Sequence, residues 1–351
     1  MRSLTAGIPG KGQLGALFGI HPLHFETSMT MRPARAIAFA ILAVLAGVAC
    51  GDEESPDDGL TPATTLPGNM VGIAGGLPGE LVEYAVHGFS FAGSNLGFAP
   101  DAPGGASAME RHLMARATGL LPAGASPFLV SSPTCVPDKV GDGIDTDADG
   151  VPDDMTITFT AANCTVTDTA TGSVQVQRGT VRYRDTSSDL YGFDITITGL
   201  RADYYDATTL SWGRQFLTAH ETTRMQDDRG DWSIDVDGFV QSGTLDTTTF
   251  FQKAIFDLQA SFDPNGTITA GGPPPDGEIT IAGHMDLTMK PGRYKFTLFA
   301  PGPLRYEGTS CHNVDQGTIE MRLNGSTSEG TRTDWIGCED YIYEFLGSGV
   351  L

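Results

Sequence analysis

Phe256-Asp-Leu-Gln-Ala-Ser-Phe262 is the stretch that decides the fold, because apolar residues alternate strictly with polar ones. Successive side chains of an extended chain point to opposite faces, so this pattern makes one face apolar and leaves the other to water. From Met155 onward the same period recurs in a series of short runs. The apolar positions of these runs are Met155, Ile157 and Phe159; Val174 and Val176; Val181 and Tyr183; Ile195 and Ile197; Leu210 and Trp212; Trp232, Ile234 and Val236; Ile279 and Ile281; Tyr294, Phe296 and Leu298; Ile319, Met321 and Leu323; and Tyr341, Tyr343 and Phe345.

Turn-forming residues separate these runs, for example Pro264-Asn-Gly266 and Asn324-Gly325. Short connections favour antiparallel neighbours, and one apolar face with one wet face is typical of antiparallel sheet. We therefore expect a mainly β protein whose chief element is a large antiparallel sheet of about 10–12 strands. So many strands must curl to bury their apolar face, which predicts a strongly curled sheet or a partly open barrel.

Residues 78–122 predict one or two helices ahead of the strands. Leu81, Tyr84 and Ala85 lie at helical spacing. Further on, Ser107-Ala-Met-Glu110 matches a capping box, and this second helix should end near Thr118. We expect these helices to cover one opening of the curled sheet.

Acidic residues are concentrated in one short loop, Asp145-Thr-Asp-Ala-Asp-Gly-Val-Pro-Asp153, immediately before the first strand. Calcium takes six to eight oxygen ligands, and alternate carboxylates allow a chain to wrap around the ion. An EF-hand would require Glu at the twelfth position and a helix beyond it, whereas Thr156 and a strand pattern stand there. We therefore predict a calcium loop of another type within residues 142–154.

This loop resembles the calcium loops of thrombospondin type 3 repeats, in which Asp-x-Asp-x-Asp-Gly-x-Pro-Asp recurs. The resemblance covers about ten residues and a single copy, and it implies one bound Ca²⁺. The ligands that it predicts are Asp145, Asp147, Asp149, the carbonyl oxygen of Val151, and Asp153. The alternative is an acidic, solvated connection that binds no ion.

The N-terminal region has the pattern of a secretory signal. Met31-Arg-Pro-Ala-Arg35 is basic, residues 36–49 carry no charge, and small residues precede Cys50. This segment resembles a bacterial lipoprotein signal with its lipobox, although Gly47 stands where Leu is usual. The resemblance implies that Cys50 carries the lipid and that the protein is anchored in a bacterial membrane. An ordinary cleaved signal, with Cys50 as a disulfide partner, is the alternative.

The chain divides into three parts by composition. Residues 1–49 form the N-terminal extension and signal peptide, and residues 50–69 form a disordered acidic tether rich in Asp, Glu, Pro and Thr. Residues 70–351 form a single β-rich domain with a helical N-terminal part. This organisation predicts a lipoprotein of the outer membrane or the cell surface, facing the periplasm or the exterior.

The formal net charge of the chain is −22 at pH 7. Such a charge disfavours nucleic acid and direct adhesion to anionic lipid, so the only membrane contact that we predict is the lipid anchor. A partner protein or hydrophobic ligand is not identified by the sequence.

Four cysteines follow Cys50, and an even number in an exported chain predicts two disulfides. Four cysteines allow three pairings. We favour pairing between nearest neighbours, because a single bridge would then join the segments before and after the calcium loop. The competing interpretation, one zinc site made by all four thiolates, lacks the usual close cysteine pairs. The four residues are Cys135, Cys164, Cys311 and Cys338.

No catalytic motif is recognisable in the sequence, which has no nucleophile elbow, phosphate-binding loop or dinucleotide fingerprint. His220-Glu221 begins like a zinc-protease motif, but Arg224 stands where the second His is required. The sequence therefore predicts a non-enzymatic structural or binding lipoprotein. A carrier of a lipid or hydrophobic ligand in a half-barrel is the first alternative, and a secreted hydrolase without a recognisable motif is the second.

Overall fold

The computed structural model describes most of the chain from Cys135 onward and part of the region before it. Cys50, the tether up to residue 59 and the predicted helix at 107–118 lie outside the described residues. Residues 60–67 of the predicted disordered tether lie against the sheet instead, because Leu66 is 3% exposed in the core and the Ala63 amide donates to the Arg293 carbonyl at 2.7 Å. The described residues are 60–67, 74, 76–79, 81, 82, 85, 86, 89, 135, 137–141, 146, 153–168, 173–186, 191–206, 208–244, 247–268, 274–289, 292–338 and 340–347.

Fourteen strands within these residues confirm the mainly β class. They are β1 Asp138–Val140, β2 Asp154–Phe159, β3 Thr165–Asp168, β4 Ser173–Asp185, β5 Tyr191–Asp206, β6 Ser211–Gln226, β7 Arg229–Thr244, β8 Thr247–Pro264, β9 Gly277–Met289, β10 Gly292–Phe299, β11 Leu304–Glu307, β12 Asn313–Leu323, β13 Gly330–Gly337 and β14 Asp340–Leu346. The number exceeds the prediction because β1, β3 and β11 have only three or four residues, too few to show a period of two.

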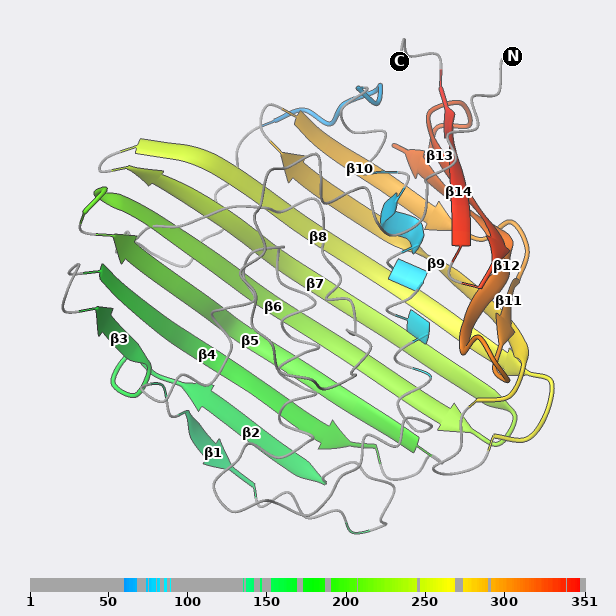
Figure 1. The fold of residues 1–351 in the computed structure, drawn as a ribbon, viewed down its shortest axis with the longest axis horizontal. Coiled ribbons are helices and arrows are strands. Elements are labelled where there is room, and N and C mark those ends of the chain that lie inside the picture. The colour runs from blue at the N-terminus through cyan, green and yellow to red at the C-terminus, as the bar shows by residue number, and fades with distance from the viewer. Residues whose placement is uncertain are drawn as a thin grey trace, which may run out of the picture.

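All fourteen strands belong to one sheet, and every strand pair in it is antiparallel (Figure 1). The main path runs β1-β2-β4-β5-β6-β7-β8-β9-β10-β12-β13-β14, while β3 pairs with β4 and β11 pairs with β12 and β9. Nearly every long strand therefore lies beside its neighbour in the chain. This meander is the arrangement that the short turns predict.

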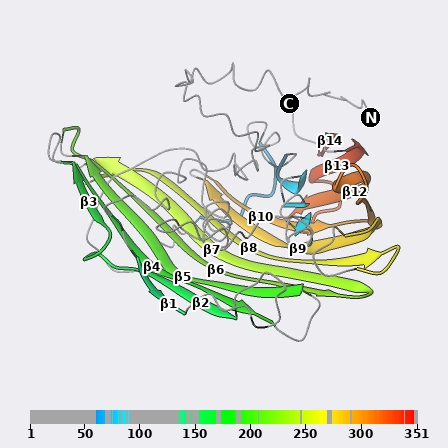
Figure 2. The same cartoon turned by 60° about the horizontal axis from the view of Figure 1, so that its bottom comes forward.

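The sheet is strongly curled, as Figure 2 shows from below. Two adjacent bulges contribute to the bend, between Arg178 and Thr180 in β4 and between Ile197 and Leu200 in β5. Gly179 has a φ of 118°, and a Cβ there would lie 2.5 Å from the backbone oxygen of Gly199. Glycine is required at this bulge because a side chain would collide with the neighbouring strand.

The concave face of the sheet carries the core. One cross-strand row crosses most of the sheet, and its members are apolar apart from the buried Glu221 and Thr331 and the glycine Gly283. Ile234, Leu258, Leu298 and Met321 in that row are at most 1% exposed. Each such side chain contributes about 1.5–3 kcal/mol when fully buried, so this face supplies much of the stability. The whole row is Ile195, Glu221, Ile234, Leu258, Gly283, Leu298, Met321 and Thr331.

A helical segment between Ala74 and Phe89 lies inside the curve formed by β9 to β14 (Figures 1 and 2). Its apolar residues recur every three or four positions, and Leu81 and Ala85 are 2% and 0% exposed, as predicted. Tyr84, the third residue of that prediction, lies outside the described residues. The Thr331 hydroxyl donates to the Ala74 carbonyl at 2.7 Å. The helix begins before residue 78, because Ala74 and Leu77 are also helical and buried. Among the described residues, no helix is long and apolar enough to cross a membrane.

The predicted apolar pair Leu210 and Trp212 is wrong. Leu210 lies in the turn before β6 with a φ of 52° and is 47% exposed. Trp212 lies on the opposite face from Leu217, where its Nε1 donates to the Thr244 carbonyl at 3.1 Å. It is not part of the main core. Phe216 and Phe239 also lie outside that core, and their rings stack with centroids 5.3 Å apart.

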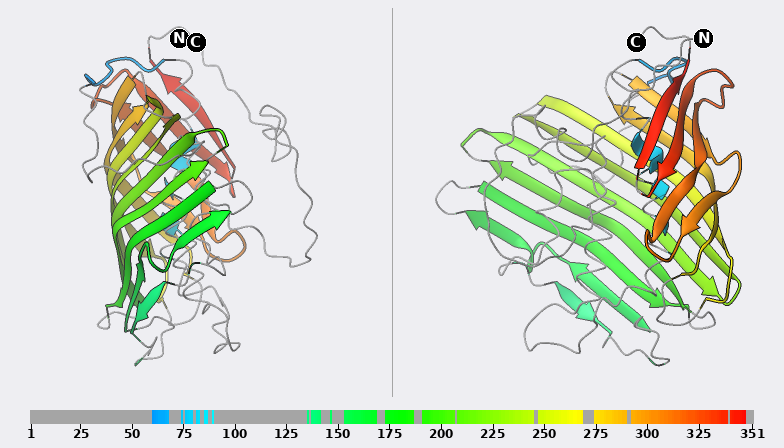
Figure 3. Two further views of the ribbon diagram at one scale, coloured as in Figure 1. Left: turned by 90° about the vertical axis from the view of Figure 1, so that its left-hand side faces the viewer. Right: turned by 45° about the vertical axis from the view of Figure 1, so that its right-hand side comes forward.

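The main path of the sheet ends at β1 on one side and at β14 on the other (Figure 3). Strand β1 is three residues long and fully exposed, whereas β14 packs Tyr341, Tyr343 and Phe345 against the core. The ring of Tyr341 lies 5.8 Å from that of Trp335 on β13. The two edges are therefore unequal, and the last strands curl back over the helical segment.

Candidate functional site

The predicted calcium loop leads into β2, and the structure describes Thr146 and Asp153 of it. The Thr146 amide donates to Asp153 Oδ1 at 2.9 Å, and its hydroxyl donates to Oδ2 at 2.5 Å. The hydroxyl bond, followed by the amide bond, lowers the pKa of the Asp153 carboxyl. The carboxylate is therefore ionised at neutral pH, and each oxygen keeps a second lone pair for a cation.

The other four predicted ligands, Asp145, Asp147, Asp149 and Val151, lie outside the described residues. Within the part of the chain that the structure describes, no three His, Cys, Asp or Glu side chains lie close enough to hold a metal ion. Asp153 fits the chemistry of a calcium ligand, because it is an exposed, ionised oxygen donor where the loop closes on itself. The calcium site itself stays a prediction.

Asp154, the next residue, belongs to the sheet. Its two oxygens accept from Arg182 on β4, at 3.1 Å from Nε and 2.6 Å from Nη2. The bond from Arg182 is the main cause that lowers the pKa of the Asp154 carboxyl. The acidic run is thus divided, with Asp153 turned to the loop and Asp154 neutralised by the neighbouring strand.

A disulfide joins Cys135 to Cys164, and their Cα atoms are 4.1 Å apart. The bridge closes 29 residues that include the whole predicted loop, and the two cysteines are only 3% and 1% exposed. The Cys164 carbonyl accepts from the Gln177 amide of β4 at 2.9 Å, which attaches the bridge to the sheet. The predicted nearest-neighbour pairing is therefore confirmed here.

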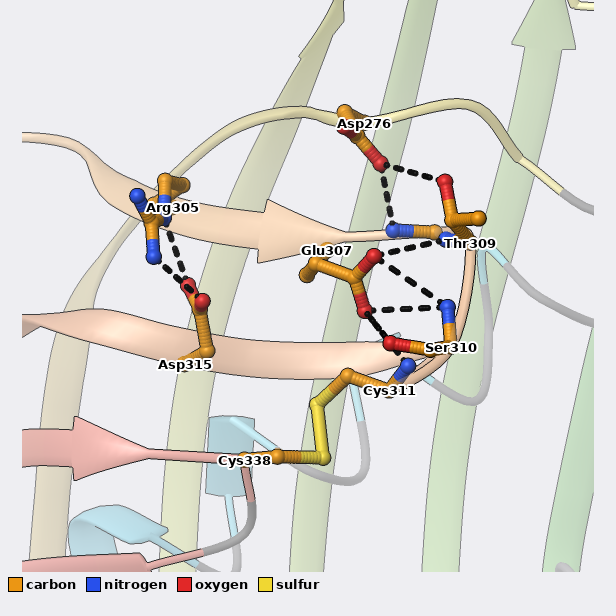
Figure 4. Close-up of polar contacts among 9 residues, drawn as sticks. Asp276, Arg305, Glu307, Thr309, Ser310, Cys311, Asp315 and Cys338 are labelled. Atoms are coloured by element: carbon orange, nitrogen blue, oxygen red, sulfur yellow. Dashed lines mark hydrogen bonds and ion pairs between the residues drawn. A yellow bond between two sulfur atoms is a disulfide. The ribbon is translucent and has the colours of Figure 1, made fainter.

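The second disulfide, Cys311–Cys338, confirms the same pairing rule, with Cα atoms 5.6 Å apart. It joins the turn between β11 and β12 to the turn between β13 and β14 (Figure 4). Cys338 is exposed and Cys311 is half-buried. This bridge thus lies at the surface, whereas the first one lies in the core.

Glu307 organises the turn beside this second bridge (Figure 4). Its carboxylate accepts from the amides of Thr309 at 3.1 Å and Ser310 at 3.0 Å, from the Ser310 hydroxyl at 3.0 Å, and from the Cys311 amide. The Cys311 bond is the largest cause that lowers the pKa of the Glu307 carboxyl, and the Ser310 and Thr309 bonds add to it. Converging amides make a concave site for an anion, and here the chain supplies the anion itself.

Asp276 completes the turn from the segment before β9. Its Oδ1 accepts from the Gly308 amide at 2.9 Å and from the Thr309 hydroxyl at 3.4 Å. The two carboxylates therefore hold consecutive amides from Gly308 to Cys311. Sequence reasoning missed this arrangement, although an acidic residue before Gly-Thr-Ser-Cys was a local signal for a side chain that accepts from the following backbone.

A shallow groove of about 510 Å³ lies on the convex face, over β8, β9 and β10. Asp257 and His284 are directly opposite each other across β8 and β9, and Ile255 is 37% exposed beside them. Asp286, in the same groove, is paired with Arg293 at 2.6 Å. The groove is open to solvent, and its lining mixes charged residues such as Asp257 and Lys295 with apolar ones such as Ile255. It lies on the opposite face of the sheet from the core, which includes Cys135 and Cys164.

No protein-family model, curated protein or solved structure matches this chain.

Proposed function

We propose that this chain is an exported, lipid-anchored and calcium-stabilised lipoprotein of the bacterial cell envelope, whose β domain is a non-enzymatic structural or binding module. The observation that carries this proposal is that the four cysteines after Cys50 form two disulfides. Disulfides persist in oxidising compartments outside the cytosol and are rare inside it. The cysteine chemistry therefore agrees with the secretory signal in the sequence.

The close packing of the described apolar residues on the concave face favours a structural or binding module over the lipid-carrier alternative. A carrier needs an apolar space that a ligand can enter. Here Leu258, Ile319 and Leu323 are 0% exposed, and the helical segment between Ala74 and Phe89 packs against the same core. The apolar face of this sheet thus serves the stability of the domain itself.

Calcium has a defined part in this proposal. The loop joins Cys135, which is bridged to Cys164, to β2 near one edge of the sheet. Asp145, Asp147, Asp149, Asp153 and the Val151 carbonyl would hold the ion there. One bound ion would relieve repulsion among these carboxylates at the entry to β2.

The anchor is tested by detergent phase separation after expression of the full chain in a bacterial host. We expect the wild type in the detergent phase and Cys50→Ser in the aqueous phase, because a lipidated cysteine adds buried CH₂ groups worth about 0.8 kcal/mol each. Both proteins should retain their two disulfides, which mass spectrometry checks. Recovery of both proteins from the aqueous phase would refute the anchor.

A further inference from the structure

The two disulfides differ sharply in accessibility. Cys135 and Cys164 are 3% and 1% exposed in the core, whereas Cys338 is exposed on the turn between β13 and β14. An attacking thiolate must approach one sulfur directly, so exchange depends on access. A thiol in solution can therefore reach one bridge of the folded protein and not the other.

The two sulfurs of the exposed bridge are also unequal. Cys311 is half-buried, and its amide donates to the Glu307 carboxylate. Carboxylates stand near both sulfurs, because Glu339 and Asp340 directly follow Cys338 in the sequence. The difference in exposure therefore decides which sulfur a thiolate attacks. Cys338 lies at the outer end of the bridge, away from the Glu307 turn (Figure 4).

We infer that the Cys311–Cys338 bridge is a thiol–disulfide exchange site, at which a thiolate from a small thiol or a protein dithiol attacks Cys338. The attacking sulfur forms a bond to Cys338 Sγ, the bond between the two cysteines breaks, and its electron pair leaves on Cys311 Sγ. Solvent then protonates the Cys311 thiolate. A second thiolate of the reductant then attacks the reductant sulfur that is bonded to Cys338. This attack releases Cys338 as a thiol and leaves the reductant as a disulfide.

The fold around the bridge survives its opening. Strand β13 remains paired with β12 from Gly317 to Arg322 and with β14 along its length. The Glu307 carboxylate still holds the amides of the turn that carries Cys311. The two cysteines therefore stay near each other after reduction, and the exchange is reversible.

The test uses the folded full chain with any free thiol first blocked by iodoacetamide. The protein is treated with glutathione in one arm and with reduced thioredoxin in the other, quenched with acid, and mapped by mass spectrometry. We expect the surface bridge to open at least about tenfold faster than Cys135–Cys164, because only the former is accessible. In the glutathione arm the adduct should be found on Cys338, with Cys311 free.

Each outcome decides the proposal. Opening of the surface bridge in either arm supports the site, and the faster arm identifies the class of partner. Equal rates for the two bridges, glutathione found mainly on Cys311, or no opening before the protein is denatured would each overturn it.

Discussion

Phe89 and Phe262 offer a direct measure of how firmly the helical segment is held against the sheet. Their ring centroids lie 5.8 Å apart, and the two side chains are 2% and 1% exposed. Phe262 also meets the ring of Tyr306 edge-on at 5.5 Å, so it links the helix, β8 and β11. Replacing either ring by leucine removes the aromatic contact and keeps most of the apolar volume.

We expect Phe89→Leu to lower the free energy of unfolding by about 1–2 kcal/mol, as small core truncations do. Phe262→Leu should cost about 0.5–1.5 kcal/mol more, because it loses a second ring contact. The double variant should lose less than the two single variants together, by about 0.5–1.5 kcal/mol, which is the usual contribution of a buried aromatic pair.

The assay is urea unfolding of the wild type, both single variants and the double variant, followed by circular dichroism and by tryptophan fluorescence. Phe296→Leu is the matched control, since Phe296 is also 2% exposed but its ring faces Tyr294 at 6.5 Å. Phe296→Leu combined with Phe89→Leu should be additive within about 0.5 kcal/mol. If the free-energy losses of Phe89→Leu and Phe262→Leu also add within about 0.5 kcal/mol, the helical segment is not held through this ring contact and the reasoning fails.

Two further predictions concern the predicted calcium loop and the Glu307 turn. Removing calcium should lower the free energy of unfolding more in Cys135→Ala/Cys164→Ala than in wild type, because the predicted ion and the bridge would restrain the same segment. A bridge over 29 residues is worth roughly 3–4 kcal/mol. Additive losses within about 0.5 kcal/mol in denaturant titrations would show that the ion and the bridge act independently. Glu307 has a lowered pKa in the folded state, so its stabilisation is present above the unfolded pKa and is lost as pH falls through the folded value. Wild type should therefore exceed Glu307→Gln in stability at neutral pH and converge with it in acid, whereas parallel stability curves would contradict this.

Much of the fold could be predicted because period-two alternation is a local property of the chain. Met155, Ile157 and Phe159 are all buried in β2, as their spacing predicts. The sequence pattern of strand β4 was harder to interpret. Val176 lies opposite the polar Asp203, whereas Val181 lies opposite the apolar Ile197. A single strand therefore appeared as two runs, because its apolar residues change faces between Val176 and Val181.

The two candidate sites also differ in whether the sequence alone reveals them. The acidic loop was visible in the sequence because all its predicted ligands lie within nine residues. The Glu307 turn was not identified, because Asp276 is 31 residues away and reaches Gly308 only through the pairing of β9 with β11. Likewise, a sequence with four cysteines allows three pairings, and only their positions in the folded sheet select one.

By itself the sequence determined the β class, the apolar and polar faces of most strands, and the even set of cysteines, because each depends on residues close together in the chain. Tertiary structure alone decided the curl, the place of the helical segment and the difference between the two bridges. Exposure is a property of everything that surrounds a side chain, so no local pattern separates buried Cys164 from exposed Cys338. The chemistry that distinguishes the two disulfides therefore arises only when β11 to β14 are brought together.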